Sequence, residues 1–232
     1  ASPVLSSKRS LPASSSNSMR LPQMLEPIAD LVFYPDPLHR YMYKGNWLAR
    51  SVTQVLSHDM PAATRARIDA TKDGPDGWLI RGNTVHACLE NFLLHGDPGD
   101  VGDFSDWVTP LLAHPLFKDA EVLAAEYSVC SPSKSLGGQF DALLRTAKGK
   151  TVLCDLKTVS SKPAATSRKP ADAQLGAYNC MLIDHHPYLD VDSCLTIVAG
   201  PGITTVKASD PSECMGSWLD CWDFFNLLQP DF

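Results

Sequence analysis

The chain has 232 residues, of which 44% are hydrophobic and 20% charged, and its formal net charge is -6. This length fits one compact domain, and these fractions are ordinary for a globular protein. No apolar run approaches the roughly 20 residues that cross a bilayer, which argues against a membrane-spanning role. An acidic chain cannot hold nucleic acid through an evenly basic surface, so any nucleic-acid contact must be local.

The first 25 residues are predicted to form a disordered leader, followed by a single domain at 26–232. The leader is rich in Ser and Pro, and no acidic residue occurs before Glu26. Such a composition cannot build a packed core. A plain disordered segment is the favoured interpretation, and an organelle transit peptide is the alternative.

The first half of the domain is predicted to contain short strands followed by two helices. The segments LVFY and YMY are typical of strands, beside a Pro-Asp-Pro turn and a Lys-Gly-Asn turn. Ser51 is expected to cap a helix that begins VTQVL. Apolar residues at helical spacing predict a second helix over 78–94, which Gly96 would end.

The second half alternates strands with helices. Strands are predicted at VLAAEYSV, GQFDALLR, TVLCDLKTV, CLTIVA and ITTVK, with helices at about 171–184 and from Pro211. This order predicts an α/β (mixed α+β) fold with a central mixed β-sheet flanked by helices.

The strands GQFDALLR and TVLCDLKTV are expected to form a hairpin centred on Lys148, because a short polar loop joins them. In that register, apolar residues face one another across the strands on a single core face. The expected apolar pairs are Phe140 with Leu156, Ala142 with Cys154, and Leu144 with Val152.

The same register places Asp141 opposite Asp155, with Lys157 two residues further on. Directly opposed Cβ atoms lie about 4.5 to 5.5 Å apart, so two ionised carboxylates there would repel each other unless a cation or a shared proton intervened. A divalent ion such as Mg²⁺ or Mn²⁺ would satisfy both. The alternative is a pair of solvated acids near a sheet edge that Lys157 neutralises.

These residues carry a resemblance to a known family. Gly138-Gln139-Phe140-Asp141 followed by Asp155-Leu156-Lys157 resembles the GxxD and (D/E)xK signature of PD-(D/E)XK nucleases. Gly82 to His86 with Glu90, and Gln174 to Tyr178, are similar to two further motifs of the RecB-like branch, which includes phage and mitochondrial exonucleases.

The resemblance implies a restriction-endonuclease-like core and hydrolysis of phosphodiester bonds. It also implies a metal held by His86, Asp141, Asp155 and the backbone carbonyl of Leu156, with Lys157 as the catalytic lysine. Some relatives carry an iron–sulfur cluster on four cysteines, but Cys88, Cys194, Cys214 and Cys221 lack that spacing, so we expect none.

Other polar residues are weaker candidates. Gln174 and Tyr178 share a helical face and, from the match to the motif, are expected to position a phosphate or the attacking water; packing of the helix is the alternative. Glu90 and Glu126 are possible further metal or water contacts. Basic residues could contact the phosphates of a nucleic acid or be an ordinary solvated surface: Arg81, Lys162, Arg168 and Lys169.

The predicted function is a metal-dependent DNA exonuclease acting from single-stranded ends. A structure-specific endonuclease or resolvase is one alternative, and a non-catalytic nucleic-acid-binding recombination partner is another. Cysteines without a C-x-x-C pair indicate a reducing compartment. We therefore expect the cytoplasm of a bacterium or phage-infected cell, or an organelle matrix if the leader is a transit peptide.

Overall fold

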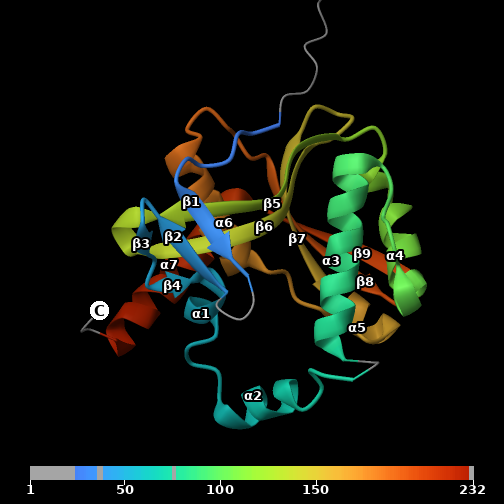
Figure 1. Ribbon diagram of the computed structural model, residues 1–232, viewed down its shortest axis with the longest axis horizontal. Helices are drawn as coiled ribbons and strands as arrows, with labels where there is room; N and C mark the ends of the chain where they lie inside the picture. Colours follow the sequence, from blue (N-terminus) through green and yellow to red (C-terminus); the bar gives the residue numbers. More distant parts are fainter. Residues whose placement is uncertain (1–23, 36–38, 75–76, 230–232) are drawn as a thin grey trace, which may run out of the picture.

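The computed structural model has a mixed α+β fold, with a central mixed sheet flanked by helices and a smaller sheet packed beside it (Figure 1). This confirms the predicted fold class. None of the helices in the part of the chain that the structure describes is long and apolar enough to span a bilayer. The described residues are 24–35, 39–74 and 77–229.

Most of the predicted leader, and most of the Pro-Asp-Pro turn, lie outside the described residues. The leader was predicted to extend through residue 25, but the Leu25 backbone N–H donates a hydrogen bond to the Leu123 carbonyl at 2.8 Å. Leu25 also packs against the core. The ordered domain therefore begins before residue 26.

The smaller sheet contains three antiparallel strands, β1 (Leu31–Tyr34), β2 (Arg40–Tyr43) and β3 (Asn46–Trp47). The predicted turn between β2 and β3 forms at Lys44 and Gly45, whose φ angles are 49° and 77°. Two successive positive φ angles give the tight turn that matches the twist of a hairpin, and glycine adopts the second at no steric cost.

The larger sheet is built around β6. One edge of β6 pairs with β5, while the other pairs with β4 near its start and with β7 near its end. Beyond β7 the order continues through β8, which is parallel to β7, to β9. The strands are β4 (Arg50–Ser51), β5 (Glu121–Ser131), β6 (Leu136–Arg145), β7 (Thr151–Thr158), β8 (Ser193–Gly200) and β9 (Ile203–Ser209).

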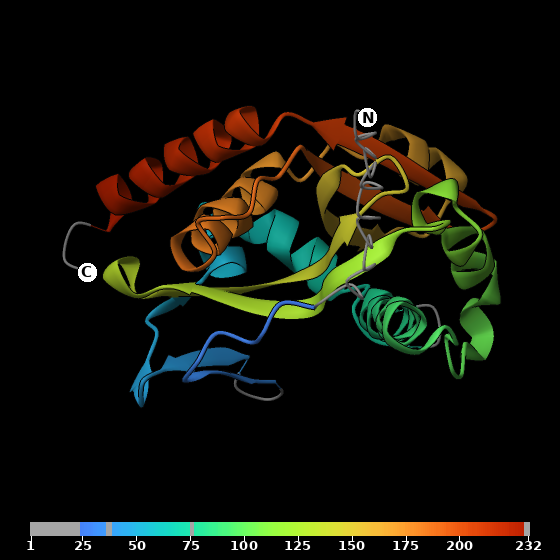
Figure 2. The same cartoon turned by 90° about the horizontal axis from the view of Figure 1, so that it is seen from above.

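Helices cover both faces of the larger sheet, because its central strands are apolar on both sides. Helices α3 (Trp78–His95) and α4 (Ser105–Leu112) bury one face, and α6 (Asp172–His185) with α7 (Pro211–Leu228) buries the other. Figure 2 shows the smaller sheet and α3 on the same side of β5 and β6, opposite α6 and α7.

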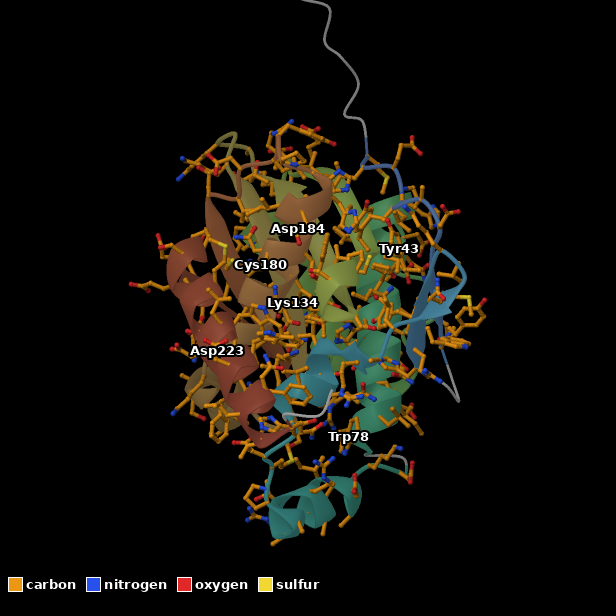
Figure 3. All side chains as sticks on the ribbon, turned by 90° about the vertical axis from the view of Figure 1, so that its left-hand side faces the viewer. Tyr43, Trp78, Lys134, Cys180, Asp184 and Asp223 are labelled. Carbon is orange, nitrogen blue, oxygen red and sulfur yellow. The ribbon has the colours of Figure 1, made fainter. Side chains whose placement is uncertain are left out.

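The pairing of α6 and α7 depends on a glycine. A Cβ at Gly176 would collide with the Cys214 backbone, so only glycine permits this approach. Figure 3 shows the two helices side by side, with Cys180 and Asp184 on α6 and Asp223 on α7.

Three helices were not predicted: α2 (Ala62–Asp69), α4, and α5 (Lys162–Ser167). The sequence indicated a basic loop after β7, but Ser161 caps α5 by accepting a hydrogen bond from the Ala164 N–H. The remaining elements are α1 (Val52–Leu56), which Ser51 caps as predicted, and 3-10 turns at Gly102–Phe104, Pro115–Phe117 and Pro132–Lys134.

Candidate active site

The candidate site lies where β6 and β7 separate. The predicted hairpin register is confirmed for Ala142 with Cys154, Leu143 with Leu153, and Leu144 with Val152. The ladder ends at the first of these pairs. Beyond it, the Asp141 carboxylate accepts a hydrogen bond from the Leu156 backbone N–H, so a side chain takes the place of the next strand contact.

The prediction that Phe140 and Ala142 lie on the same face of the sheet is wrong. Phe140 stacks on Tyr127, with ring centroids 5.4 Å apart, in the cluster beneath α6. Ala142 belongs to the cluster beneath α3. The change of face coincides with Glu126 of β5, whose φ is 44° and which lies between the partners of the two residues. A positive φ interrupts the alternation of faces along a strand pair.

Three side chains from three elements meet at this interruption: His86 of α3, Glu126 of β5 and Asp141 of β6. His86 Nδ1 lies 2.7 Å from Asp141 Oδ1 and 3.8 Å from Glu126 Oε1. One potential ligand atom from each residue lies within 4.8 Å of the other two. Their side chains are 33%, 24% and 11% exposed in that order, so the group is accessible from solvent.

The charges of this group are strongly coupled. Burial lowers the pKa of His86, but Asp141 and Glu126 outweigh it and raise the pKa to about 10. Burial raises the pKa of Glu126 to about 7, with repulsion from Asp141 adding and the hydrogen bond to His86 opposing. Burial also acts against ionised Asp141, but His86 holds its pKa below the ordinary value. Without metal, a protonated imidazole therefore supplies the cation.

Asp155 and Lys157 form a second charged pair beside the first group. Lys157 Nζ lies 2.8 Å from Asp155 Oδ2, and Asp155 is only 2% exposed. Burial raises the pKa of Asp155, and repulsion from Asp141 adds to the rise while Lys157 opposes it. Each acid of the predicted pair thus has its own cation.

The predicted ligand set therefore divides in the structure. His86 and Asp141 come together with Glu126, whereas Asp155 lies outside this group of three and pairs with Lys157. Leu156 contacts Asp141 through its N–H. The carbonyl of Leu156 as a ligand stays a prediction.

Gln174 and Tyr178 extend the second pair. Lys157 Nζ donates to Gln174 Oε1 at 2.8 Å, and Gln174 Nε2 donates to the Tyr178 hydroxyl at 2.8 Å. Burial, with Asp155 adding, raises the pKa of Tyr178 well above its ordinary value, so this hydroxyl stays protonated. A Cβ at Gly138 would lie 2.7 Å from Tyr178 Cε1, which explains the glycine of the GxxD motif.

Glu126 is only a possible further contact in the sequence, yet it lies in the group of three. Applying the register argument to the β5–β6 pair would have found it, because Glu126 and Asp141 fall between the same paired neighbours. Glu90 is half-buried one turn after His86, and its charge raises the pKa of Glu126. It is not a member of the group.

The basic residues singled out in the sequence differ in exposure. Arg81 is 6% exposed, and its guanidinium lies 5.8 Å from the Trp107 ring centroid, so its assignment to an open binding groove is wrong. The reason is helical spacing, because Arg81 shares the buried stripe of α3. Lys162, Arg168 and Lys169 are exposed on and after α5.

The cysteines are free thiols. Cys88 lies in the cluster on the α3 face of the larger sheet, while Cys194 and Cys214 lie in the cluster on the α6 face. A layer of strands therefore separates the early cysteine from the later ones.

Comparison with known proteins adds little. No family model matches the sequence, and the search of curated proteins found no match. Among solved structures, the chain is similar to one titled "Crystal structure of SSO0001", with 15% identity, a TM-score of 0.40 and coverage of 75% of each chain. A TM-score of this size carries no argument about activity. The resemblance to PD-(D/E)XK nucleases stays a prediction from the motifs.

Proposed function

We propose that the chain is a metal-dependent nuclease that hydrolyses the phosphodiester bonds of DNA, acting as an exonuclease from single-stranded ends. One observation carries the proposal: the His86, Glu126 and Asp141 group meets the Asp155 and Lys157 pair where two strands separate. Packing alone gives no reason to bury so many charges together, since each costs free energy to desolvate.

The donor atoms fit a divalent ion. Two carboxylates and one imidazole, with ligand atoms within 4.8 Å of one another, suit Mn²⁺ or Mg²⁺. When bound there, such an ion would polarise a phosphate oxygen and lower the pKa of a coordinated water. The repulsion between Glu126 and Asp141 favours binding, because a cation relieves it.

The other residues position a proton-carrying group. Asp155 and Gln174 hold the Lys157 ammonium from two sides, and Tyr178 fixes the Gln174 amide in turn. Held in this way, the ammonium can orient an attacking water or neutralise charge on the phosphate without reorganising during the reaction. Asp155 is thus a positioning residue in the metal-free protein.

End-labelled and circular DNA, each single- and double-stranded, would test the proposal with Mg²⁺, Mn²⁺ or EDTA present. We expect linear single strands to be degraded from their ends only with metal, and circles to survive. Cleavage of circles would favour the endonuclease alternative. Metal-independent binding without cleavage of any substrate would favour the non-catalytic alternative, and Asp155→Asn is the control for a contaminating nuclease.

A role in DNA repair or recombination would accord with this activity. Free thiols accord with a reducing compartment, such as the cytoplasm or an organelle matrix.

A further inference from the structure

The outer face of the smaller sheet carries exposed aromatic rings. Tyr34 of β1 is 36% exposed and Trp47 of β3 is 39% exposed, with their ring centroids 5.0 Å apart. Val32, 45% exposed, adds to the same face of β1. Burying aromatic surface is strongly favourable, so large exposed rings in contact with each other indicate a binding surface.

Positive charge accompanies these rings. The Arg40 guanidinium lies over the Trp47 ring, 4.6 Å from its centroid. Arg40 is exposed, and strands β1, β2 and β3 contain no acidic residue, although in the sequence Asp30 precedes β1 and Asp36 follows it. The Arg40 guanidinium beside the exposed rings complements an anionic ligand.

The inner face ties this sheet to the candidate site. Phe33 and Tyr41 stack at 4.8 Å and pack in one cluster with Cys130 of β5. A Cβ at Gly137 would lie 2.5 Å from Tyr41 Cγ, so Tyr41 lies directly on β6. The smaller sheet also projects from the same side of the larger sheet as α3, which carries His86 (Figure 2).

We propose that this outer face binds single-stranded nucleic acid by stacking its bases on Tyr34 and Trp47, with Arg40 contacting its phosphates. Aromatic rings stack on any base, and an arginine over such a ring adds a cation–π contribution. Bases inside a duplex are already stacked and cannot reach the rings. The inference deepens the proposed nuclease function, on which it rests, by assigning the surface that would hold the single strand.

The test measures binding without cleavage. In EDTA, fluorescence anisotropy would compare the full chain's affinity for a labelled oligothymidylate of about 12 nucleotides with that for an abasic strand of equal length and charge. We expect the thymidine strand to bind at least about fivefold more tightly. Trp47→Ala and Tyr34→Ala should each remove most of this preference while leaving the abasic affinity unchanged.

Matched variants separate stacking from other effects. Phe224→Ala removes an aromatic ring of α7 that is 46% exposed, and it should leave the preference intact. Trp47→Phe should retain most of the preference, because it keeps a ring. Arg40→Gln should weaken binding of both strands. If a variant binds the abasic strand with unchanged affinity, it is folded. The comparison of the two strands with the wild-type protein does not depend on any variant.

Equal affinity of the wild-type protein for the two strands would overturn the proposal, as would a preference that survives both alanine variants. If Trp47→Ala instead lowered the mass measured by light scattering and left strand binding unchanged, the face would be a contact between protein copies, which also overturns it. Because metal is absent, the result is independent of cleavage. Base-dependent binding without nuclease activity would contradict only the proposed function.

Discussion

The Asp141 carboxylate links the two halves of the site, because it accepts the Leu156 backbone N–H and also lies 2.7 Å from His86 Nδ1. One side chain thus closes the end of a strand pair and supplies a potential ligand. The sequence suggested that Asp141 and Asp155 would repel each other until metal bound. The structure instead gives Asp141 a protonated histidine and Asp155 a lysine.

This relationship predicts the behaviour of Asp141→Asn. An amide cannot balance the charge of protonated His86, so the metal-free variant should melt below the wild-type protein. Millimolar Mn²⁺ should raise the wild-type melting temperature. At a hundredfold excess of Mn²⁺ over its Kd, the free energy of unfolding should increase by about 2.7 kcal/mol. The variant should lose nearly all of this gain, and thermal melts with and without Mn²⁺ would measure it. A variant that kept the full gain would contradict the proposed metal site.

The stability of the metal-free protein should fall as pH rises from about 5 to 9. Folding raises the pKa of Glu126 from 4.5 to about 7 and the pKa of His86 from 6.5 to about 10. Each group stabilises the fold below its unfolded pKa and loses that contribution as pH passes through its folded pKa. Melts of wild type, Glu126→Gln and His86→Gln would test this.

The Glu126→Gln variant should reduce the loss of stability with rising pH below about pH 7. The His86→Gln variant should reduce the loss above about pH 6.5. With Mn²⁺ present, the metal-induced gain should instead increase with pH, because binding requires both groups to lose their protons. A wild-type melting temperature that rises with pH without metal would contradict the assigned charges.

Asp155 and Lys157 should be essential for cleavage. They begin the series of polar contacts that continues through Gln174 to Tyr178. Asp155→Asn and Lys157→Ala should each lower kcat at least about a hundredfold, the scale on which preorganised charge contributes. Metal-free strand binding should change little, since neither residue lies on the smaller sheet. Single-turnover assays would separate kcat from binding. Near-wild-type rates in both variants would refute the proposed roles.

Two glycine substitutions should act in opposite directions. Gly138→Ala puts a Cβ 2.7 Å from the Tyr178 ring, so it should destabilise the protein by about 1 to 3 kcal/mol. It should also displace the hydrogen bonds that link Tyr178 through Gln174 to Lys157. Gly216→Ala in α7 meets no atom within 4 Å and should stabilise the helix by about 0.5 to 1 kcal/mol. Chemical denaturation measures both, and cleavage should fall only in the first.

No iron–sulfur cluster is expected. Purified protein should show no visible absorbance, and Cys214→Ser should cleave at the wild-type rate, although removing this buried thiol can lower stability. Anaerobic purification and iron analysis are the measurements. A brown protein containing iron would overturn this expectation.

The sequence by itself determined the local features. Strand alternation, a polar loop and apolar spacing were enough for the β6–β7 register, α3 and the Ser51 cap, because each depends on neighbours within one or two elements. The sequence also placed Asp141, Asp155 and Lys157 near one another, since one hairpin carries all three.

Only the tertiary structure decided which charges pair. Glu126 and Asp141 lie opposite each other on β5 and β6, and the packing of α3 against the larger sheet brings His86 to both. Arg81 is buried because α4 covers its stripe of α3 with Trp107. Such contacts join elements distant in sequence, and their electrostatic energies depend on distance and burial, which periodicity does not contain.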